Sequence, residues 1–404
     1  GSILGIILLT RIAGKVRSYE KYTVPEIIGD RYGPVARNLS VFTLVMAYMV
    51  IVSYQYNAGG AVLYTILADN TGTSIISIEL ATIIAAVFII AYTMLAGLLS
   101  VAYTDAANSI IMTLALIISL PILWIKAGSW SGMETAFAAM NKSQHMQFGG
   151  VYSAMDIINF CLPPFLLVIG DANMYQRFSA SKDVQSARHS TTILVFAVLF
   201  IELLIIVSAW VSSSMIPEAE VGKHVLIYAA HQFLPTFLGA IMLTTIVGII
   251  ISTADSFLLV PANTLIRDIY LNYINPQASE KNIVRLSRLL VLLLGIIAYI
   301  VSIGFSRSAG FFERALYAYT IYGAAITPAL LAALFWRGAT KEGAVASIIC
   351  GTLVTLFWKE LPGLWFWLPT EWYISLDEVL PAISGSLLAL ICVSYLTQKA
   401  DPGK

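Results

Sequence analysis

Long runs of apolar residues with almost no charge occupy most of the chain. Most of them reach the roughly 20 residues that a helix needs to cross a bilayer. A transmembrane β-strand needs only about ten alternating residues, so continuous runs of this length favour helices. We predict an all-α polytopic membrane protein with eleven membrane segments, at 1–12, 39–68, 76–97, 102–125, 151–170, 190–215, 235–266, 284–305, 312–336, 342–358 and 379–398.

The composition excludes several other classes of protein. Hydrophobic residues make up 58% of the 404 residues and charged residues 11%, where soluble domains have about 25% charged residues. A soluble enzyme and a disordered chain are therefore both ruled out. The formal net charge is zero, which also argues against a nucleic-acid partner. The predicted partner is the lipid bilayer.

The loop charges predict the orientation of the segments. The chain has 23 Lys and Arg residues, and 17 of them fall on the side that the chain reaches after its first segment. By the positive-inside rule that side is cytoplasmic, and so is the C-terminus. We expect an integral protein of a bacterial inner or plasma membrane. The remaining six basic residues lie on the opposite side: Lys126, Lys142, Lys223, Arg307, Arg314 and Lys359.

The fifth segment carries a predicted helix break. Pro163 and Pro164 remove two backbone donors, and Gly170, Asp171 and Asn173 follow shortly after. Broken membrane helices expose backbone groups that bind ions or substrates near the midplane. The alternative is a proline kink that serves packing only.

The seventh segment contains Ser252, Thr253, Asp255 and Ser256 within an otherwise apolar helix. Ser252 and Ser256 are four residues apart and share a face. Such oxygen groups suit a monovalent cation, because Mg²⁺ and Ca²⁺ prefer more carboxylates. We expect Asp105 of the fourth segment at a similar depth, where it can share a cation, or a proton, with Asp255. The alternatives are that the hydroxyls bond to their own helix and that Asp105 caps one.

The second and ninth segments carry polar aromatic clusters. Gln55 lies seven residues from Tyr48 on one helix face, and Tyr319 and Thr320 stand in the middle of the ninth segment. Both clusters are candidates for the lining of a substrate pocket. Packing between helices is the alternative for each of them.

Four ordered motifs make the chain resemble the sodium/solute symporter family, which includes sodium-coupled proline, glucose, pantothenate and sialic acid transporters. They span residues 22–344 together with a weaker fifth match at Phe335-Trp336-Arg337 and Gly343-Ala344. The four are Tyr22-Thr23-Val24-Pro25-Glu26 with Arg31-Tyr32-Gly33, Ala96-Gly97-Leu98 with Tyr103-Thr104-Asp105, Gly170-Asp171 with Gln176-Arg177 and Ala180-Ser181-Lys182, and Ser252-Thr253-Ala254-Asp255-Ser256 with Arg267-Asp268-Ile269-Tyr270.

The resemblance implies a LeuT-type fold, in which two five-helix repeats have inverted topology. Residues 1–126 then hold core helices two to five, 151–337 hold core helices six to ten, and 342–399 form two accessory helices. The first core helix is therefore expected to be missing from this chain.

The resemblance also implies the ion ligands. The family's common sodium site corresponds to the hydroxyls of Ser252 and Thr253 with the carbonyl of Ile249. A second sodium, which some members bind, corresponds to Asp105, Asp255 and Ser256. Sialic acid-type members have Ser where Asp255 stands, so the number of sodium ions stays open.

The substrate positions that the resemblance implies depart from the sugar transporters. Asp171, Asn173 and Thr320 stand where sugar members have other residues, and Gln55 and Tyr319 complete the predicted pocket. We expect a small amino acid, carboxylate or vitamin-like solute.

The expected function is sodium-coupled import of a small organic solute by alternating access. No catalytic constellation and no cofactor are predicted, with Na⁺ as the coupling ion. Two alternatives remain: a transporter-like sensor module of a larger signalling protein, and proton coupling in place of sodium coupling.

Overall fold

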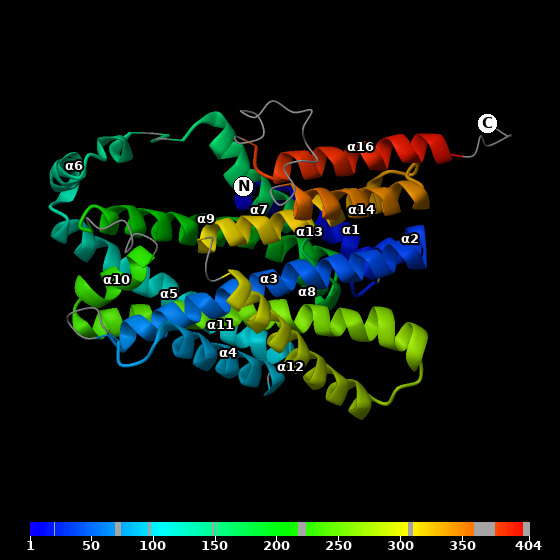
Figure 1. Ribbon diagram of the computed structural model, residues 1–404, viewed down its shortest axis with the longest axis horizontal. Helices are drawn as coiled ribbons and strands as arrows, with labels where there is room; N and C mark the ends of the chain where they lie inside the picture. Colours follow the sequence, from blue (N-terminus) through cyan, green and yellow to red (C-terminus); the bar gives the residue numbers. More distant parts are fainter. Residues whose placement is uncertain are drawn as a thin grey trace.

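Each of the eleven predicted segments contains a helix in the computed structural model (Figure 1). The structure describes residues 1–19, 21–68, 74–95, 98–147, 149–150, 152–216, 224–305, 310–358 and 376–398. Within these residues the only β pairing is an isolated bridge between Ala68 and Ser74. The all-α prediction is confirmed.

The helices include several short ones that the apolar runs did not predict, namely α2, α6, η1, α8, α10 and the π-helix η3. In chain order the helices are α1 Ser2–Ser18, α2 Val24–Tyr32, α3 Pro34–Ile66, α4 Ile78–Leu95, α5 Leu98–Lys126, α6 Ser129–Ala139, η1 Ser143–Met146, α7 Ala154–Gly170, α8 Ala172–Ala180, α9 Val184–Ser213, α10 Val225–Gln232, α11 Thr236–Thr264, η3 Leu265–Ile274, α12 Glu280–Phe305, α13 Phe311–Phe335, α14 Lys341–Phe357 and α16 Val379–Thr397.

Nine helices in the described part of the chain are long and apolar enough to cross a membrane. The helices of the first and tenth predicted segments, α1 and α14, have 17 residues each and are slightly shorter than this. A helix of 17 residues still lies at the lower end of the length that spans a bilayer. The chain is an integral membrane protein.

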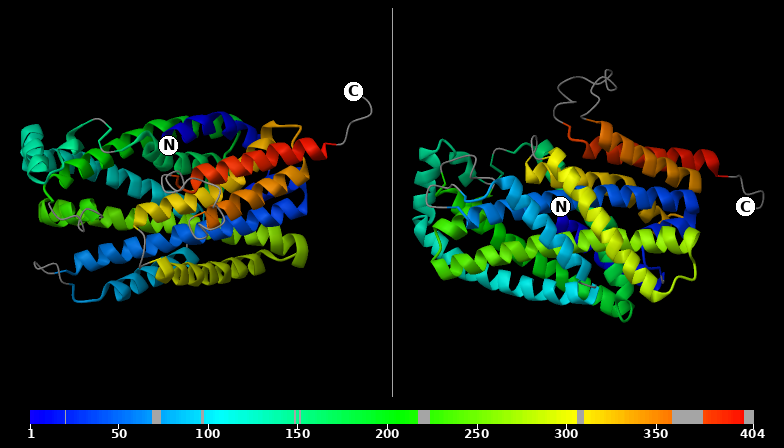
Figure 2. Two further views of the ribbon diagram at one scale, coloured as in Figure 1. Left: turned by 45° about the horizontal axis from the view of Figure 1, so that its top comes forward. Right: turned by 60° about the horizontal axis from the view of Figure 1, so that its bottom comes forward.

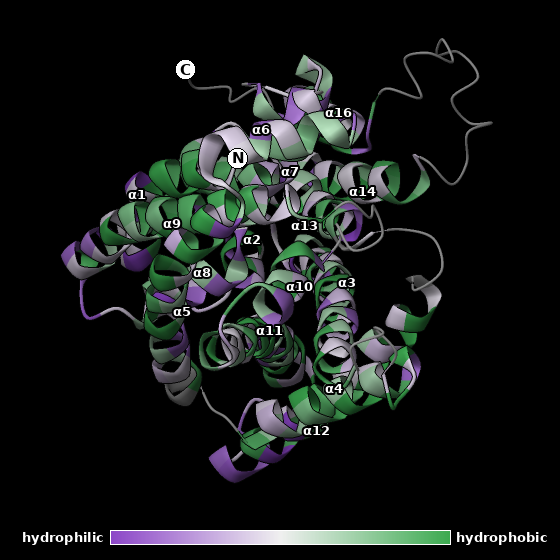
Figure 3. Ribbon diagram, turned by 90° about the vertical axis from the view of Figure 1, so that its left-hand side faces the viewer, coloured by the Kyte–Doolittle hydropathy of each residue, from purple (hydrophilic) through white to green (hydrophobic). Residues whose placement is uncertain are grey.

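The helices differ strongly in burial. Among the candidate spans, α13 and α3 are the most buried and α9 is the least. Figure 3, a view along the long axis, shows α9 and α5 at the edge of the bundle with largely hydrophobic residues. Apolar residues all round an outer helix are what contact with lipid requires. The centre of the protein is therefore built on α3 and α13.

The two ends of the bundle carry different elements. At one end, which we name the α2 end, lie α2, the turn between η3 and α12, and the turn between α13 and α14 (Figure 1). The opposite end carries α6 and α10. Figure 2 shows α12 crossing the bundle obliquely along one side. The predicted cytoplasmic loops lie at the α2 end.

A tight turn joins α2 to α3 at the α2 end. Gly33 adopts φ +88°, a conformation that side chains other than glycine rarely tolerate. Pro34 follows as the first residue of α3, where its missing N–H costs nothing. Thr23 caps α2 by accepting a hydrogen bond from the Glu26 amide at 3.0 Å. These residues of the first family motif thus define the ends of α2.

Helices α7 and α13 pack closely through two glycines. A Cβ on Gly323 of α13 would lie 2.7 Å from Leu166 Cβ and 3.0 Å from the Leu167 nitrogen. A Cβ on Gly170 of α7 would overlap the Thr327 hydroxyl. Small residues allow membrane helices to approach in this way.

Some predictions concern regions beyond the described residues. Ala96 and Gly97 of the second motif, residues 359–375 of the accessory region and the tail at 399–404 lie outside them. The absence of a first core helix stays a prediction.

The contact between α7 and α13 predicts a selective effect of added methyl groups. Gly323→Ala should lower the free energy of unfolding by about 1–3 kcal/mol, because a closely packed interface must open to admit the Cβ. Thermal unfolding in detergent measures this loss.

Gly304→Ala in α12 is the matched control, because nothing lies within 4 Å of the position that a Cβ would take there. It should leave the melting temperature unchanged or raise it slightly, since Ala has the higher helix propensity. Equal melting temperatures for the two variants would contradict the close contact.

Candidate functional site

The break in the fifth apolar segment lies at Gly170–Asp171 and not at the prolines. Helix α7 continues through Pro163 and Pro164 to Gly170. The prediction that the two prolines break the helix is therefore wrong. The missing N–H groups of adjacent prolines are tolerated inside a membrane helix whose neighbours are closely packed. The break comes at Asp171, with φ −60° and ψ 110°, and α8 begins at Ala172.

Side-chain hydroxyls satisfy the backbone carbonyls near this break. Tyr322 of α13 donates to the Gly170 carbonyl at 2.7 Å, and Tyr175 of α8 donates to the Ile169 carbonyl at 3.0 Å. Thr327 of α13 donates to the Leu166 carbonyl at 2.8 Å. Because backbone groups within a bilayer must find partners in the protein, these hydroxyls stabilise the interruption.

Asp171 is the polar centre of the break. Its carboxylate accepts a hydrogen bond from the Tyr48 hydroxyl at 2.6 Å and from the Asn173 amide at 3.1 Å, which caps α8. The Tyr48 ring packs against Phe257 of α11 with centroids 4.6 Å apart and against Tyr322 at 5.6 Å. Asp171 therefore links α3 to α8, and the Tyr48 ring extends this contact to α11 and α13.

A second polar cluster joins α5, α8 and α11. The Ser252 hydroxyl of α11 donates to Asp105 of α5. Arg177 of α8 reaches the other oxygen of the same carboxylate at 3.0 Å and the Ser256 hydroxyl at 3.4 Å. We name Asp105, Arg177, Ser252 and Ser256 the polar cluster. Asp105 lies two turns after the start of α5, so the alternative that Asp105 caps a helix is wrong.

Asp255 points to a different neighbour. The Thr93 hydroxyl of α4 donates to one of its carboxylate oxygens. Its other oxygen has no hydrogen-bond partner among the described residues, and the side chain is only 1% exposed. Asp105 and Asp255 thus have separate partners, and their sharing of one ion stays a prediction. A buried carboxylate oxygen without a partner is costly unless a bound ion or a proton satisfies it.

The other predicted residues lie around these two groups. Tyr319 of α13 pairs with Tyr54 of α3 through their hydroxyls at 3.2 Å, beside the partly exposed Gln55. The Thr320 hydroxyl donates to the Leu316 carbonyl of its own helix at 2.9 Å. Thr253 is partly buried on α11, one turn beyond Ile249.

Sequence reasoning gave no functional role to two of these residues. Arg177 was visible in the third motif, but nothing in the sequence pairs it with Asp105, 72 positions away. Thr93 is a threonine in an apolar run, where bonding to its own helix is the ordinary expectation. The Thr93 hydroxyl lies 2.8 Å from the Ile89 carbonyl as well, so this carbonyl and Asp255 are two acceptors for its one hydrogen.

Chemically, the arrangement suits ion and solute binding more than bond-making. It offers carboxylate and hydroxyl oxygens from several helices beside a helix break. Among the described residues no group of three or more His, Cys, Asp or Glu side chains converges as a metal centre would require. Hard monovalent cations are bound by oxygens of this kind.

Comparisons with known proteins agree with this chemistry. The model of the sodium:solute symporter family matches residues 2–351. The sodium/proline symporter of Haemophilus influenzae is 26% identical, over 96% of this chain and 78% of that protein. The high-affinity proline transporter PutP of Bacillus subtilis is 25% identical, over 96% and 80%. The sodium/glucose cotransporter of Vibrio parahaemolyticus is 24% identical, over 84% of this chain and 67% of that protein.

The fold also matches a solved structure. A substrate-bound, outward-open structure of a Na⁺-coupled sialic acid symporter superimposes with a TM-score of 0.74, covering 98% of this chain and 83% of that one. The sequences are 15% identical, so the likeness concerns the fold. The predicted LeuT-type architecture is confirmed.

The contact between Thr93 and Asp255 predicts a stability effect. Thr93→Val keeps the shape of the side chain but leaves the buried carboxylate without its hydroxyl partner. We expect a loss of about 1–3 kcal/mol in the free energy of unfolding, measured by thermal unfolding in detergent.

Thr192→Val on α9 is the control, because the Thr192 hydroxyl is exposed and bonds only to the Arg188 carbonyl of its own helix. It should change stability by less than about 0.5 kcal/mol. A Thr93→Val protein as stable as this control would remove Thr93 from the support of Asp255.

Proposed function

The chain belongs to the sodium:solute symporter family, and within this family we propose that it imports a small amino acid of the proline type together with sodium. It is thus a sodium-coupled solute symporter and not an enzyme. The observation that carries the proposal is the polar cluster on α5, α8 and α11, which α8 connects to the break at Asp171.

Sodium is proposed to bind beside Ser252. The Ser252 and Thr253 hydroxyls and the Ile249 carbonyl would supply three oxygens, in keeping with the family resemblance. Asp105 accepts the hydrogen bond of Ser252, so its carboxylate lies next to the proposed ion position. A carboxylate with hydroxyl and carbonyl oxygens is a donor set that fits a hard monovalent cation.

A second sodium at Asp105, Asp255 and Ser256 would meet Arg177. The guanidinium lies 3.0 Å from Asp105 and 3.4 Å from Ser256, so it neutralises the carboxylate and occupies the hydroxyl of two of the three proposed ligands. Two cations a few ångströms apart in a medium of low dielectric constant repel each other strongly. We propose that one sodium binds in this conformation, and that a second binds only when Arg177 leaves the cluster.

The solute is proposed to bind at the α7–α8 break. The Asp171 carboxylate would attract the amine, and the rings of Tyr48, Tyr322 and Phe257 would pack against the apolar part. Asn173, Gln55, Tyr319 and Thr320 are the proposed polar surroundings. A carboxylate and packed aromatic rings suit an amino acid better than a sugar, whose recognition needs many neutral hydrogen bonds. Five curated relatives of similar sequence, all proline transporters, support the same choice.

The proposed orientation places the α2 end in the cytoplasm of a bacterial cell, following the excess of Lys and Arg there. We assign residues 1–126 and 151–337 to the two repeats and 342–399 to the accessory region. Sodium moving inward releases about 2.3 kcal/mol per 100 mV and would drive uptake. Sodium would act by stabilising the outward-open state that binds solute.

Transport itself is the first test. In proteoliposomes an inward sodium gradient should drive accumulation of radiolabelled L-proline, because the ion gradient is the only energy source. Replacing external sodium with potassium, or collapsing the gradient with a sodium ionophore, should abolish accumulation. Excess unlabelled proline should compete and glucose should not. Accumulation that ignores sodium would sink the proposal, and so would competition by glucose alone.

The sodium ligands give a second test. The double variant Ser252→Ala and Thr253→Ala should raise the sodium concentration for half-maximal uptake at least tenfold, since two of three proposed oxygens are lost. The control is the double variant Ser109→Ala and Thr113→Ala on α5. It also removes one serine and one threonine hydroxyl, and these two bond only to backbone carbonyls of their own helix. An equal sodium dependence in both double variants would exclude Ser252 and Thr253 as ligands.

A further inference from the structure

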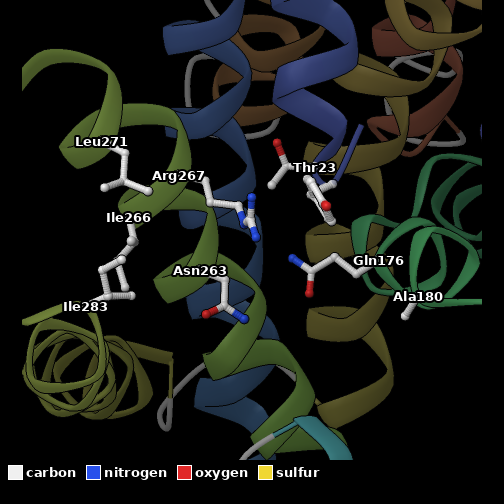
Figure 4. Close-up of a pocket in the computed structure, with 9 residues that line it drawn as sticks. Thr23, Gln176, Ala180, Asn263, Ile266, Arg267, Leu271 and Ile283 are labelled. Carbon is white, nitrogen blue, oxygen red and sulfur yellow. The ribbon is translucent and has the colours of Figure 1, made fainter. Parts of the chain in front are cut away.

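A cavity of about 400 Å³ lies at the α2 end of the bundle, away from the α7–α8 break. The start of α2, helix α8, the end of α11 with η3, and the first turns of α12 surround it (Figure 4). None of the solute or sodium positions proposed above lines it. Its volume exceeds that of a small amino acid, so it is large enough to hold one.

Three polar side chains face this cavity from three elements, α8, α11 and η3. Figure 4 shows the Arg267 guanidinium, the Gln176 amide and the Asn263 amide directed toward the same space. Within the part of the chain that the structure describes, no hydrogen bond of these three side chains to another protein group is found. They are therefore available to a ligand.

Arg267 is held in a fixed position while its donors stay available. Its guanidinium carbon lies 4.0 Å from the centroid of the Tyr22 ring. Stacking uses the face of the planar guanidinium and leaves the N–H groups at its edge to bind a carboxylate with two parallel hydrogen bonds.

The charge balance of the cavity favours an anion. Among the described residues that line it, Arg267 is the only charged one and none is acidic. The neighbouring Asp268 is engaged elsewhere, with the Thr23 hydroxyl at 2.7 Å and with Arg37 at 3.6 Å. The rest of the wall includes Ile266, Leu271 and Ile283, which suits a ligand with an apolar body.

The cavity continues the polar face of α11 that begins in the polar cluster. Asn263 is seven residues beyond Ser256, which places both on one face of α11 about 10 Å apart. On α8, Gln176 directly precedes Arg177 of the cluster. A solute that leaves the centre toward the α2 end would thus meet Gln176 and Asn263 next.

We propose that this cavity is a release site, in which Arg267, Gln176 and Asn263 bind the carboxylate of the solute on its way out of the α2 end. The inference rests on the proposed transport of a small amino acid. Arg267 donates two hydrogen bonds to the carboxylate, the two amides donate one each, and the apolar wall packs against the body of the solute. Because no sodium ligand takes part, binding here does not require sodium.

The test is saturation-transfer NMR on the purified protein in sodium-free potassium buffer, with L-proline and L-prolinamide as probes. L-Proline should give a signal, and L-prolinamide, which lacks the carboxylate, should give little. Arg267→Gln should weaken L-proline binding about tenfold, as the loss of a charge-assisted pair predicts. Arg285→Gln on α12 removes the same charge at the same end but outside the cavity lining, and should bind like the wild type.

Sodium-driven uptake of L-proline, measured in parallel, separates this inference from the proposed function. Arg267→Gln should keep the external KM of the wild type, because the cavity is not the entrance. An L-proline signal of the same strength in Arg267→Gln and in Arg285→Gln would overturn the release site even where uptake is normal. A signal from glycerol 3-phosphate with none from L-proline would assign the cavity to phosphate headgroups and would also overturn it. The proposed function alone would be overturned by a third result: no sodium-driven uptake by the wild type, together with an L-proline signal that depends on Arg267.

Discussion

The interruption between α7 and α8 sets the arrangement of the centre of the protein. A helix break inside a bilayer exposes carbonyls that cannot bond to water, so the protein must provide donors for them. Tyr322 and Thr327 of α13 and Tyr175 of α8 provide them. Because Gly170 has no side chain, α13 can approach α7 closely enough for the bonds from Tyr322 and Thr327 to form. The burial of α13 and the position of Asp171 both follow from satisfying one interrupted stretch of backbone.

Buried charge is the second constraint, and the protein meets it differently at its two inner carboxylates on α5 and α11. Asp105 has a full positive charge beside it in Arg177 and a hydroxyl in Ser252, so its burial is compensated. Asp255 has only the Thr93 hydroxyl, and one of its oxygens lacks a protein partner in the described region. A cation that binds near α11 would gain most from Asp255, which is uncompensated, and would compete with Arg177 for Asp105. The proposed ion binding would be coupled to the position of Arg177 for this reason.

The sequence predicts the features that depend on local periodicity, and it misses those that depend on contacts between distant segments. Helical segments follow from apolar length, and the α7–α8 region follows from its Gly, Asp and Asn residues. The predicted position of the break was wrong because two prolines carry a stronger local signal than a glycine. The break instead combines a local signal, the capping of α8 by Asp171, with the close approach of α13, which no local pattern contains. Thr93 and Arg177 were missed for the same reason, since their partners lie 162 and 72 residues away. The family resemblance predicts ion ligands by position, but it does not predict which neighbour each of them touches.

Helix α11 connects the two regions where the family motifs gather. Its middle carries Ser252 and Ser256 of the polar cluster, and its continuation η3 carries Asp268, which binds Thr23 of α2 and Arg37 of α3. These contacts hold the α2 end together next to the cavity that Arg267 lines. A shift of α11 that accompanies ion binding would act on both regions at once, because α11 and η3 follow each other without a gap. The first and fourth motifs are therefore connected in the structure. The fourth motif begins at the proposed ion ligands, and near its end Asp268 contacts Thr23 of the first motif. The hydroxyl of the motif residue Thr23 is engaged by this contact with Asp268, which gives Thr23 a structural reason to be in the motif.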